Sequence, residues 1–170
     1  FLMFWEGVSI ELQVQAVSRL PKGRLYQFNP KLPMSDISQV ISKMPRSTRL
    51  MLSNDAVSTN LGGCYEAVSS LPATCYLQFN SNFPPEQAHQ ICEKLKPGRF
   101  AFITPQMPPA LVEAIAAALP PFTAIEFDPN VDVSIAKQAV SKLGPNCSLY
   151  LNVDTSLEFA KAVMPSLAEN

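Results

Sequence analysis

The feature that most constrains the fold of this chain is a repeat with a period of about 24 residues. Seven apolar segments with helical periodicity each end in Leu or Met, and Pro follows within two residues in the first six. The seven anchor residues are Leu20, Met44, Leu71, Leu95, Leu119, Leu143 and Leu167. By subtraction, their spacings are 24, 27, 24, 24, 24 and 24 residues. Self-similarity at such a period is typical of proteins built from stacked repeats.

Each repeat opens with a short segment in which apolar residues alternate with others. A period of two places every second side chain on the same face of a strand. The expected core-facing pairs are Leu2/Phe4, Tyr26/Phe28, Leu50/Leu52, Leu77/Phe79, Phe100/Phe102, Ile125/Phe127 and Leu149/Leu151. Three residues after such a pair, four repeats carry Asp55, Asn82, Asn130 or Asp154. These side chains are suited to satisfying backbone groups where a strand ends and the chain turns.

An amphipathic helix is expected after each strand. Eleven residues before the anchors stand Ser9, Pro33, Asn60, Pro84, Pro108, Asp132 and Ser156. Ser, Asn and Asp are N-cap residues, and Pro suits the start of a helix. Apolar residues recur 7, 4 and 3 positions before the anchor, as Val112, Ile115 and Ala116 do before Leu119, which gives an apolar stripe along the helix. The Pro after the anchor then ends the helix.

A strand and a helix in about 24 residues cannot bury their own apolar stripe, so the copies must stack. The sequence therefore predicts one α/β solenoid over residues 1–170, with a curved parallel sheet inside and helices outside. About seven repeats are expected, near residues 1–21, 24–45, 48–72, 75–97, 99–120, 123–145 and 147–170.

Segments 77–82 (Leu-Gln-Phe-Asn-Ser-Asn) and 125–130 (Ile-Glu-Phe-Asp-Pro-Asn) resemble the L-x-L-x-x-N core of leucine-rich repeats. The ending Ala-Val-Ser-Lys-Leu at 139–143 resembles the longer, helix-bearing kind. The resemblance covers the whole chain and implies the fold more strongly than the function. The chain departs from the leucine-rich-repeat pattern in two ways. Phe often replaces the strand Leu, and the Leu expected three residues before the core-facing pair is replaced by Gly23, Ser47, Thr74 and Pro97. Such divergent repeats resemble those of secreted bacterial effectors that act inside host cells.

Charge and hydropathy narrow the function classes. The net charge of −1 argues against nucleic acid as the main partner, and the chain contains no apolar run of about 18 residues that would span a membrane. The charge is uneven: seven basic residues and one acid lie between Arg19 and Arg49, whereas seven acids and three lysines lie from Glu113 onward. A solenoid separates these into a basic end and an acidic end, and the basic end favours a partner with an acidic surface.

No catalytic, cofactor or metal site is indicated by the sequence. Cys64, Cys75, Cys92 and Cys147 have neither disulfide nor metal-ligand spacing, and we interpret them as small buried residues of a protein in a reducing compartment such as the cytosol, including a host cytosol reached by secretion. His89 is the single histidine and has no apparent acid or nucleophile partner. The segment Gly62-Gly63-Cys64 suggests an exposed thiol, but a nucleophile needs a nearby base. The chain is therefore predicted not to be an enzyme.

The candidate binding residues lie at the outward positions of the expected strands. They are Met3, Trp5, Gln27, Arg49, Met51, Tyr76, Gln78, Arg99, Glu126 and Tyr150. Trp, Tyr, Met and Arg are enriched at protein interfaces, and the concave sheets of solenoids are extended binding surfaces. We predict a scaffold that binds a partner protein on this face. The alternative is a substrate-targeting domain of a larger effector enzyme whose catalytic region lies outside this chain.

The two ends of the solenoid generate a first prediction. The first five residues are apolar with no repeat before them, and Leu167 ends the last helix with no polar capping repeat after it. Open solenoid ends require caps, and an apolar edge strand pairs readily with another chain. We therefore expect either further repeats or caps in the native protein, or self-association of these 170 residues. Sedimentation velocity measures this: a full-length chain identical to this one that stays monomeric at high concentration contradicts it.

Overall fold

The computed structural model, which describes residues 1–4 and 7–167, is a curved α/β solenoid. Its strands are β1 (Leu25–Gln27), β2 (Arg49–Leu52), β3 (Tyr76–Phe79), β4 (Phe100–Ile103), β5 (Ala124–Phe127) and β6 (Ser148–Tyr150). Its helices are α1 (Ile10–Ser18), α2 (Met34–Ile41), α3 (Asn54–Ser69), α4 (Pro85–Cys92), α5 (Pro109–Ala118), α6 (Val133–Val140), α7 (Leu157–Val163) and the 3₁₀ helix η1 (Met164–Leu167). The predicted alternation of strand and helix is confirmed.

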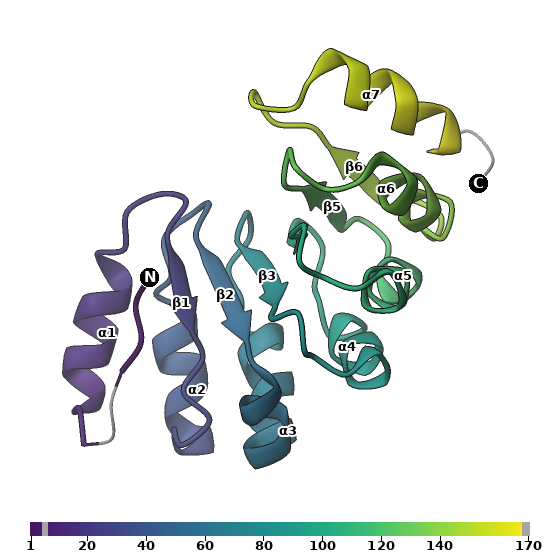
Figure 1. The fold of residues 1–170 in the computed structure, drawn as a ribbon. Helices are drawn as coiled ribbons and strands as arrows, with labels where there is room; N and C mark the ends of the chain where they lie inside the picture. The colour runs from purple at the N-terminus through teal and green to yellow at the C-terminus, as the bar shows by residue number, and fades with distance from the viewer. Residues whose placement is uncertain (5–6, 168–170) are drawn as a thin grey trace.

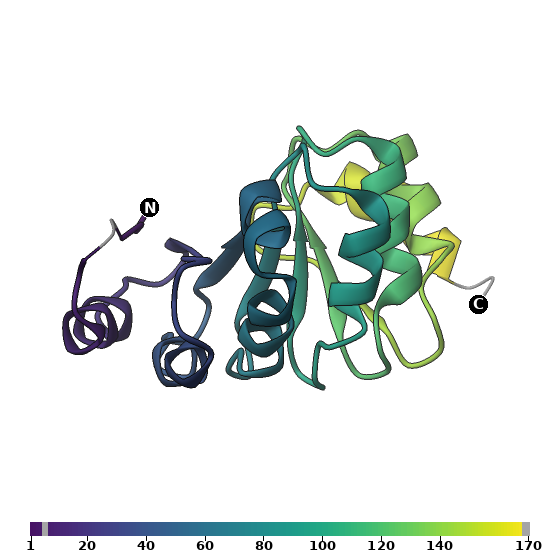
Figure 2. The same cartoon turned by 90° about the horizontal axis from the view of Figure 1, so that it is seen from below.

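Within the described residues, the strands form one parallel sheet in chain order, from β1 to β6. The first repeat adds a single parallel bridge from Leu2 to Tyr26 in place of the expected seventh strand. In Figure 1 the strands follow an arc nested inside the arc of helices, and Figure 2 shows the helices gathered on one side of the sheet. The reason is geometric: strands lie about 4.8 Å apart and packed helices about 8–10 Å apart, so the sheet must be the inner, concave layer.

The helices begin where the sequence predicts, with one exception. The side chains of Ser9, Asp132 and Ser156 accept hydrogen bonds from backbone N–H groups of α1, α6 and α7. In the repeat of 27 residues, however, α3 starts after Ser53, whose side chain caps it. The expected N-cap Asn60 lies at a kink with non-helical φ and ψ between two helical segments of α3, and its Oδ1 accepts from the N–H of Gly63 at 2.8 Å, so it caps the second segment as predicted. The insertion thus adds a helical turn on the convex side and leaves the strands aligned.

The turns after the strands are held by residues two positions earlier than expected. Oδ1 of Asp128 accepts from the N–H of Asn130 at 3.0 Å, and Oδ1 of Asn152 accepts from the N–H of Asp154 at 2.9 Å. Asn130 and Asp154 therefore supply backbone donors, and the turn-forming side chains come one residue after β5 and two residues after β6.

The register of β4 differs from the predicted one. Ala101 pairs with Leu77 on one side and Ile125 on the other, so Ala101 and Ile103 face the core and both are buried. The pair Phe100 and Phe102, predicted to face the core, lies on the concave face, as alternation along a strand requires.

The cause of this register is a backbone turn that precedes every strand. The residue three positions before the first core residue has positive φ in each of six repeats: Gly23, Ser47, Thr74, Gly98, Phe122 and Asn146, with φ between 61° and 77°. Each of the first five donates its N–H to the carbonyl of its equivalent in the next repeat, at 2.7–3.0 Å. Because Gly98 occupies this position in its repeat, Ala101 must face the core.

The turn generates a stability prediction. A left-handed φ costs an L-residue about 1–2 kcal/mol, and a Cβ built on Gly98 would meet no atom closer than Cβ of Ala73 at 3.9 Å. Gly98→Ala should therefore lower the free energy of unfolding by about 1 kcal/mol through backbone strain alone. Phe122→Gly should leave stability unchanged or raised, since Phe122 is 66% exposed and released strain offsets the chain entropy of glycine.

Urea denaturation measures both variants, and Gly144→Ala is the matched control. A Cβ built on Gly144 would have the Leu119 carbonyl oxygen as its nearest atom, at 4.0 Å. The φ of Gly144 lies outside the left-handed region that favours glycine. If Gly98→Ala and Gly144→Ala lower the free energy of unfolding equally, the left-handed φ of Gly98 is not the cause of the destabilisation.

Candidate functional site

The concave face consists of two columns of side chains that run across the strands. One column contains Leu25, Arg49, Tyr76, Phe100, Ala124 and Ser148; the other contains Gln27, Met51, Gln78, Phe102, Glu126 and Tyr150. The structure therefore brings Gln27, Arg49, Met51, Tyr76, Gln78, Glu126 and Tyr150 from the predicted set onto one surface. Met3 follows the bridge residue Leu2 and is 40% exposed. Trp5 lies outside the described residues.

The predicted place of Arg99 in the concave face is wrong. Because β4 pairs with Tyr76 through Phe100, Arg99 precedes the concave column by one residue. Its side chain donates to the Leu71 carbonyl from Nε at 2.8 Å and to the Pro97 carbonyl from Nη1. The Leu71 carbonyl lies two residues after the end of α3, where backbone carbonyls lack partners within the helix, and the Pro97 carbonyl lies in the turn before β4.

Equivalent positions in other repeats have the same structural role. Thr48 and Thr123 donate from their hydroxyls to the carbonyls of Pro45 and Pro120, each at 2.6 Å. The thiols of Cys75 and Cys147 contact the carbonyls of Pro45 and Pro120 at 3.2 and 3.3 Å. Residues directly before the strands therefore form hydrogen bonds with the backbone of the turns between helix and strand, and they are not part of the two concave columns.

Four aromatic rings and one guanidinium form a cluster in the middle of the concave face. Ring centroids of Tyr76 lie 4.8 Å from Phe100 and 6.2 Å from Phe102, and Phe100 lies 5.3 Å from Tyr150. These separations are those of favourable offset and edge-to-face pairs. The guanidinium of Arg49 lies 3.8 Å from the Phe102 ring centroid and within 3.5 Å of Oε1 of Gln78. The register missed by the sequence analysis is what places Phe100 and Phe102 in this cluster.

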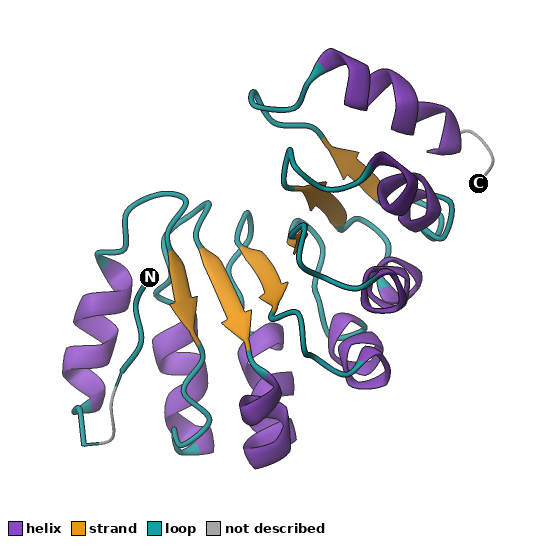
Figure 3. Cartoon of the chain, viewed as in Figure 1, coloured by secondary structure: helices purple, strands orange, loops and turns teal. Residues whose placement is uncertain are grey.

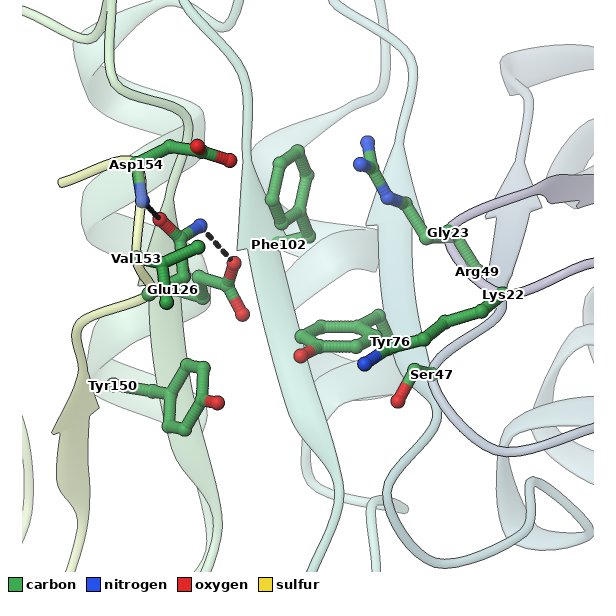
Figure 4. A pocket seen from close by; sticks show the side chains of 11 residues that line it. Lys22, Gly23, Ser47, Arg49, Tyr76, Phe102, Glu126, Tyr150, Val153 and Asp154 are labelled. Carbon is green, nitrogen blue, oxygen red and sulfur yellow. Dashed lines mark hydrogen bonds between the residues drawn. The ribbon is translucent and has the colours of Figure 1, made fainter.

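A cavity of about 330 Å³ opens beside the aromatic cluster. It is lined by Lys22, Gly23, Ser47, Arg49, Tyr76, Phe102, Glu126, Tyr150, Asn152, Val153 and Asp154. Figure 4 shows Lys22 and Arg49 on one wall, Glu126 and Asp154 on the opposite wall, and the rings of Tyr76 and Phe102 between them. The curvature of the sheet thus makes the basic and acidic ends of the solenoid face each other.

Glu126 is one of the acidic residues that line this cavity, and it is only 5% exposed. Its Oε1 accepts a hydrogen bond from Nδ2 of Asn152 at 2.7 Å, whereas Oε2 is buried and has no hydrogen-bond partner among the described residues. Burial, together with the nearby Glu126 carboxylate, raises the pKa of the Tyr76 hydroxyl above its usual range. The Tyr76 hydroxyl therefore stays protonated, and Glu126 forms no ion pair among the described residues.

The residues weighed for catalysis do not assemble a nucleophile and a base. Burial raises the pKa of the Cys64 thiol to about 12, and burial also raises the pKa of Cys92. His89 lies on α4, half exposed, with Nε2 at 3.6 Å from Glu93 one helical turn away. Across residues 1–4 and 7–167, His, Cys, Asp and Glu side chains form no group of three that could hold a metal ion. None of the described helices is both long and apolar enough to cross a bilayer.

Comparison with known proteins identifies the fold. The crystal structure of a leucine-rich repeat-containing protein from Legionella pneumophila superposes on this chain with a TM-score of 0.53 and 13% sequence identity. The match covers 98% of this chain and 61% of that protein's chain. The chain has a leucine-rich-repeat-like fold. No family model matches the sequence, and no curated protein matches it.

Because thiolates are the reactive form of cysteine, the raised pKa values give a prediction. At pH 8, Cys64 and Cys92 in the folded protein should resist alkylation by iodoacetamide, while the partly exposed Cys147 should react first. All four cysteines should react once the protein is unfolded in urea. Mass spectrometry of the peptides measures each site. Rapid alkylation of Cys64 in the folded state would instead identify an activated thiol.

Proposed function

We propose that this protein is a scaffold that binds another protein across the concave face of its sheet. The observation that carries the proposal is the cluster of Tyr76, Phe100, Phe102 and Tyr150 with Arg49 beside an open cavity. Tyr, Phe and Arg are enriched at the centres of protein interfaces, where they supply most of the binding energy. Tyr150 is 45% exposed, so part of this apolar surface remains available to a partner.

The fold supports the same proposal. A concave parallel sheet formed by stacked repeats offers an extended, largely preformed surface, so little conformational entropy is lost when a protein binds. The residues of the cluster lie on β2, β3, β4 and β6, strands that Figure 3 shows along the arc of the sheet. We therefore propose that the partner contacts the central and C-terminal repeats as well as the basic N-terminal region.

The cellular setting belongs to the same proposal. The repeats resemble those of secreted bacterial effectors, and the solved protein of similar fold is bacterial. All four cysteines are free thiols, which suits a reducing compartment. We propose that the partner is met in a cytosol, and that this is a host cytosol if the protein is secreted.

A pair of double variants tests the binding face. Arg49→Ala with Tyr76→Ala removes a cation and a ring from the concave face and should weaken partner binding by about 2 kcal/mol or more. The matched control is Tyr65→Ala with Lys94→Ala, since Nζ of Lys94 lies 5.6 Å from the Tyr65 ring on the helical side. The control should leave the partner affinity unchanged.

The measurement is isothermal titration calorimetry with a partner captured by crosslinking and identified by mass spectrometry. Thermal melting of both variants checks that they fold. If the control weakens binding and the concave variant does not, the partner binds the helices and the proposal fails.

A further inference from the structure

Resting on the proposed function, we infer that the cavity receives a basic side chain of the partner, an arginine or a lysine, which pairs with Glu126 between the rings of Tyr76 and Tyr150. The first observation behind this inference is the buried carboxylate itself. Carboxylates this deeply buried are ordinarily paired, because an isolated charge in a low-dielectric site is costly. Here Oε2 of Glu126 is buried in the cavity wall without a hydrogen-bond partner among the described residues.

The neighbours of this carboxylate within the chain are neutral donors or further acids. The amide of Asn152 bonds Oε1 at 2.7 Å, and the hydroxyl of Tyr76 points toward the carboxylate in Figure 4. Asp154 lies on the same wall and adds a second negative charge. A cation that enters the cavity therefore meets two carboxylates, and one of them, Glu126, interacts only with neutral groups among the described residues.

The cations that line the cavity lie on the opposite wall. The guanidinium of Arg49 is positioned over the Phe102 ring at 3.8 Å and beside Gln78, away from Glu126. Lys22 extends toward Tyr76 in Figure 4, and neither it nor Arg49 forms an ion pair with Glu126 among the described residues. These two cations leave the Glu126 side of the cavity as the favourable place for an incoming positive charge.

The aromatic rings favour a basic side chain over a small inorganic cation. Tyr76 and Tyr150 flank Glu126 in Figure 4, and a ring face attracts a guanidinium or ammonium through its quadrupole. The same rings pack against the aliphatic stem of arginine or lysine. A cavity of about 330 Å³ accommodates such a side chain together with water.

This inference differs from the sequence-based expectation of an acidic partner surface. The basic residues from Lys22 to Arg49 still favour an acidic region of the partner, but only the two end members of this range line the cavity, and both lie on one wall. The structure points to a partner segment in which a basic residue enters the cavity and acidic residues lie next to it, toward Lys22. Such a segment matches both walls at once.

The test uses N-acetyl-arginine-N-methylamide as a probe and its neutral isostere, N-acetyl-citrulline-N-methylamide, as the matched ligand. Protein NMR spectra recorded during titration with the arginine probe should show shifts at Tyr76, Glu126 and Tyr150. The citrulline probe should bind about 30-fold more weakly or produce no shift, because it lacks the charge that pairs with Glu126.

Glu126→Gln removes the charge and keeps the acceptor for Asn152, so it should fold and should abolish the preference for arginine over citrulline. Glu113→Gln makes the same change on helix α5 and serves as the control, with the preference intact. Tyr150→Ala is a second variant: its side chain is 45% exposed, and its loss should weaken arginine binding several-fold without disturbing the core.

Partner affinity separates this inference from the proposed function. Both hold if Glu126→Gln weakens partner binding about 30-fold and the Arg49→Ala/Tyr76→Ala variant weakens it as well. If the double variant weakens binding and Glu126→Gln does not, the concave face binds the partner without a basic residue in the cavity, and the inference is wrong. Equal binding of arginine and citrulline to the unaltered protein also overturns it, and it would indicate that Lys22 moves to neutralise Glu126 within the chain. If neither variant affects the partner, the proposed function fails.

Discussion

The left-handed turn before each strand is the constraint on which the other features of this protein depend. At Gly98 and its equivalents, the chain adopts positive φ and donates its N–H to the next repeat. The turn fixes which residue of the strand first faces the core, because side chains alternate strictly from that point. It thereby also decides which side chains reach the concave face. Four of the six turn positions are not glycine, so the stacked backbone hydrogen bonds must offset the strain at those positions.

Curvature converts this regular stacking into a site. Lys22 precedes β1 and Asp154 follows β6, so the six described strands lie between them, yet both residues line the same cavity. The bend follows from the difference in width between helices and strands, and it makes the basic and acidic ends approach each other across the aromatic cluster. The result is a cavity in which the buried side chain of Glu126 lies on one wall and the cations Lys22 and Arg49 lie on the other.

The sequence was sufficient for the features that repeat and insufficient for those that depend on geometry over long distances. The 24-residue spacing predicted the parallel sheet, the outer helices and N-caps such as Ser9 and Asp132. It also contained the correct register of β4, since Leu77 plus one period is Ala101. The local pattern favours Phe100 and Phe102 as the core-facing pair because their side chains are larger than that of Ala101. The wrong position expected for Arg99 follows from this register. One cavity is lined by Lys22, Arg49, Glu126 and Asp154 because the curvature of several repeats adds up. No local sequence pattern contains that information.

The packing distances between the outer helices affect the width of the cavity, although no helix residue lines it. The opening between the Lys22 wall and the Asp154 wall is the accumulated result of every helix-to-helix distance along the convex side. Within α5, small residues such as Ala116 are fully buried, so they permit neighbouring helices to approach closely. A larger residue there would push the helices apart and tighten the arc. Substitutions on the back of the molecule would in this way alter the fit of a ligand on the front, which lets selection tune the width of the cavity while every residue that lines it stays the same.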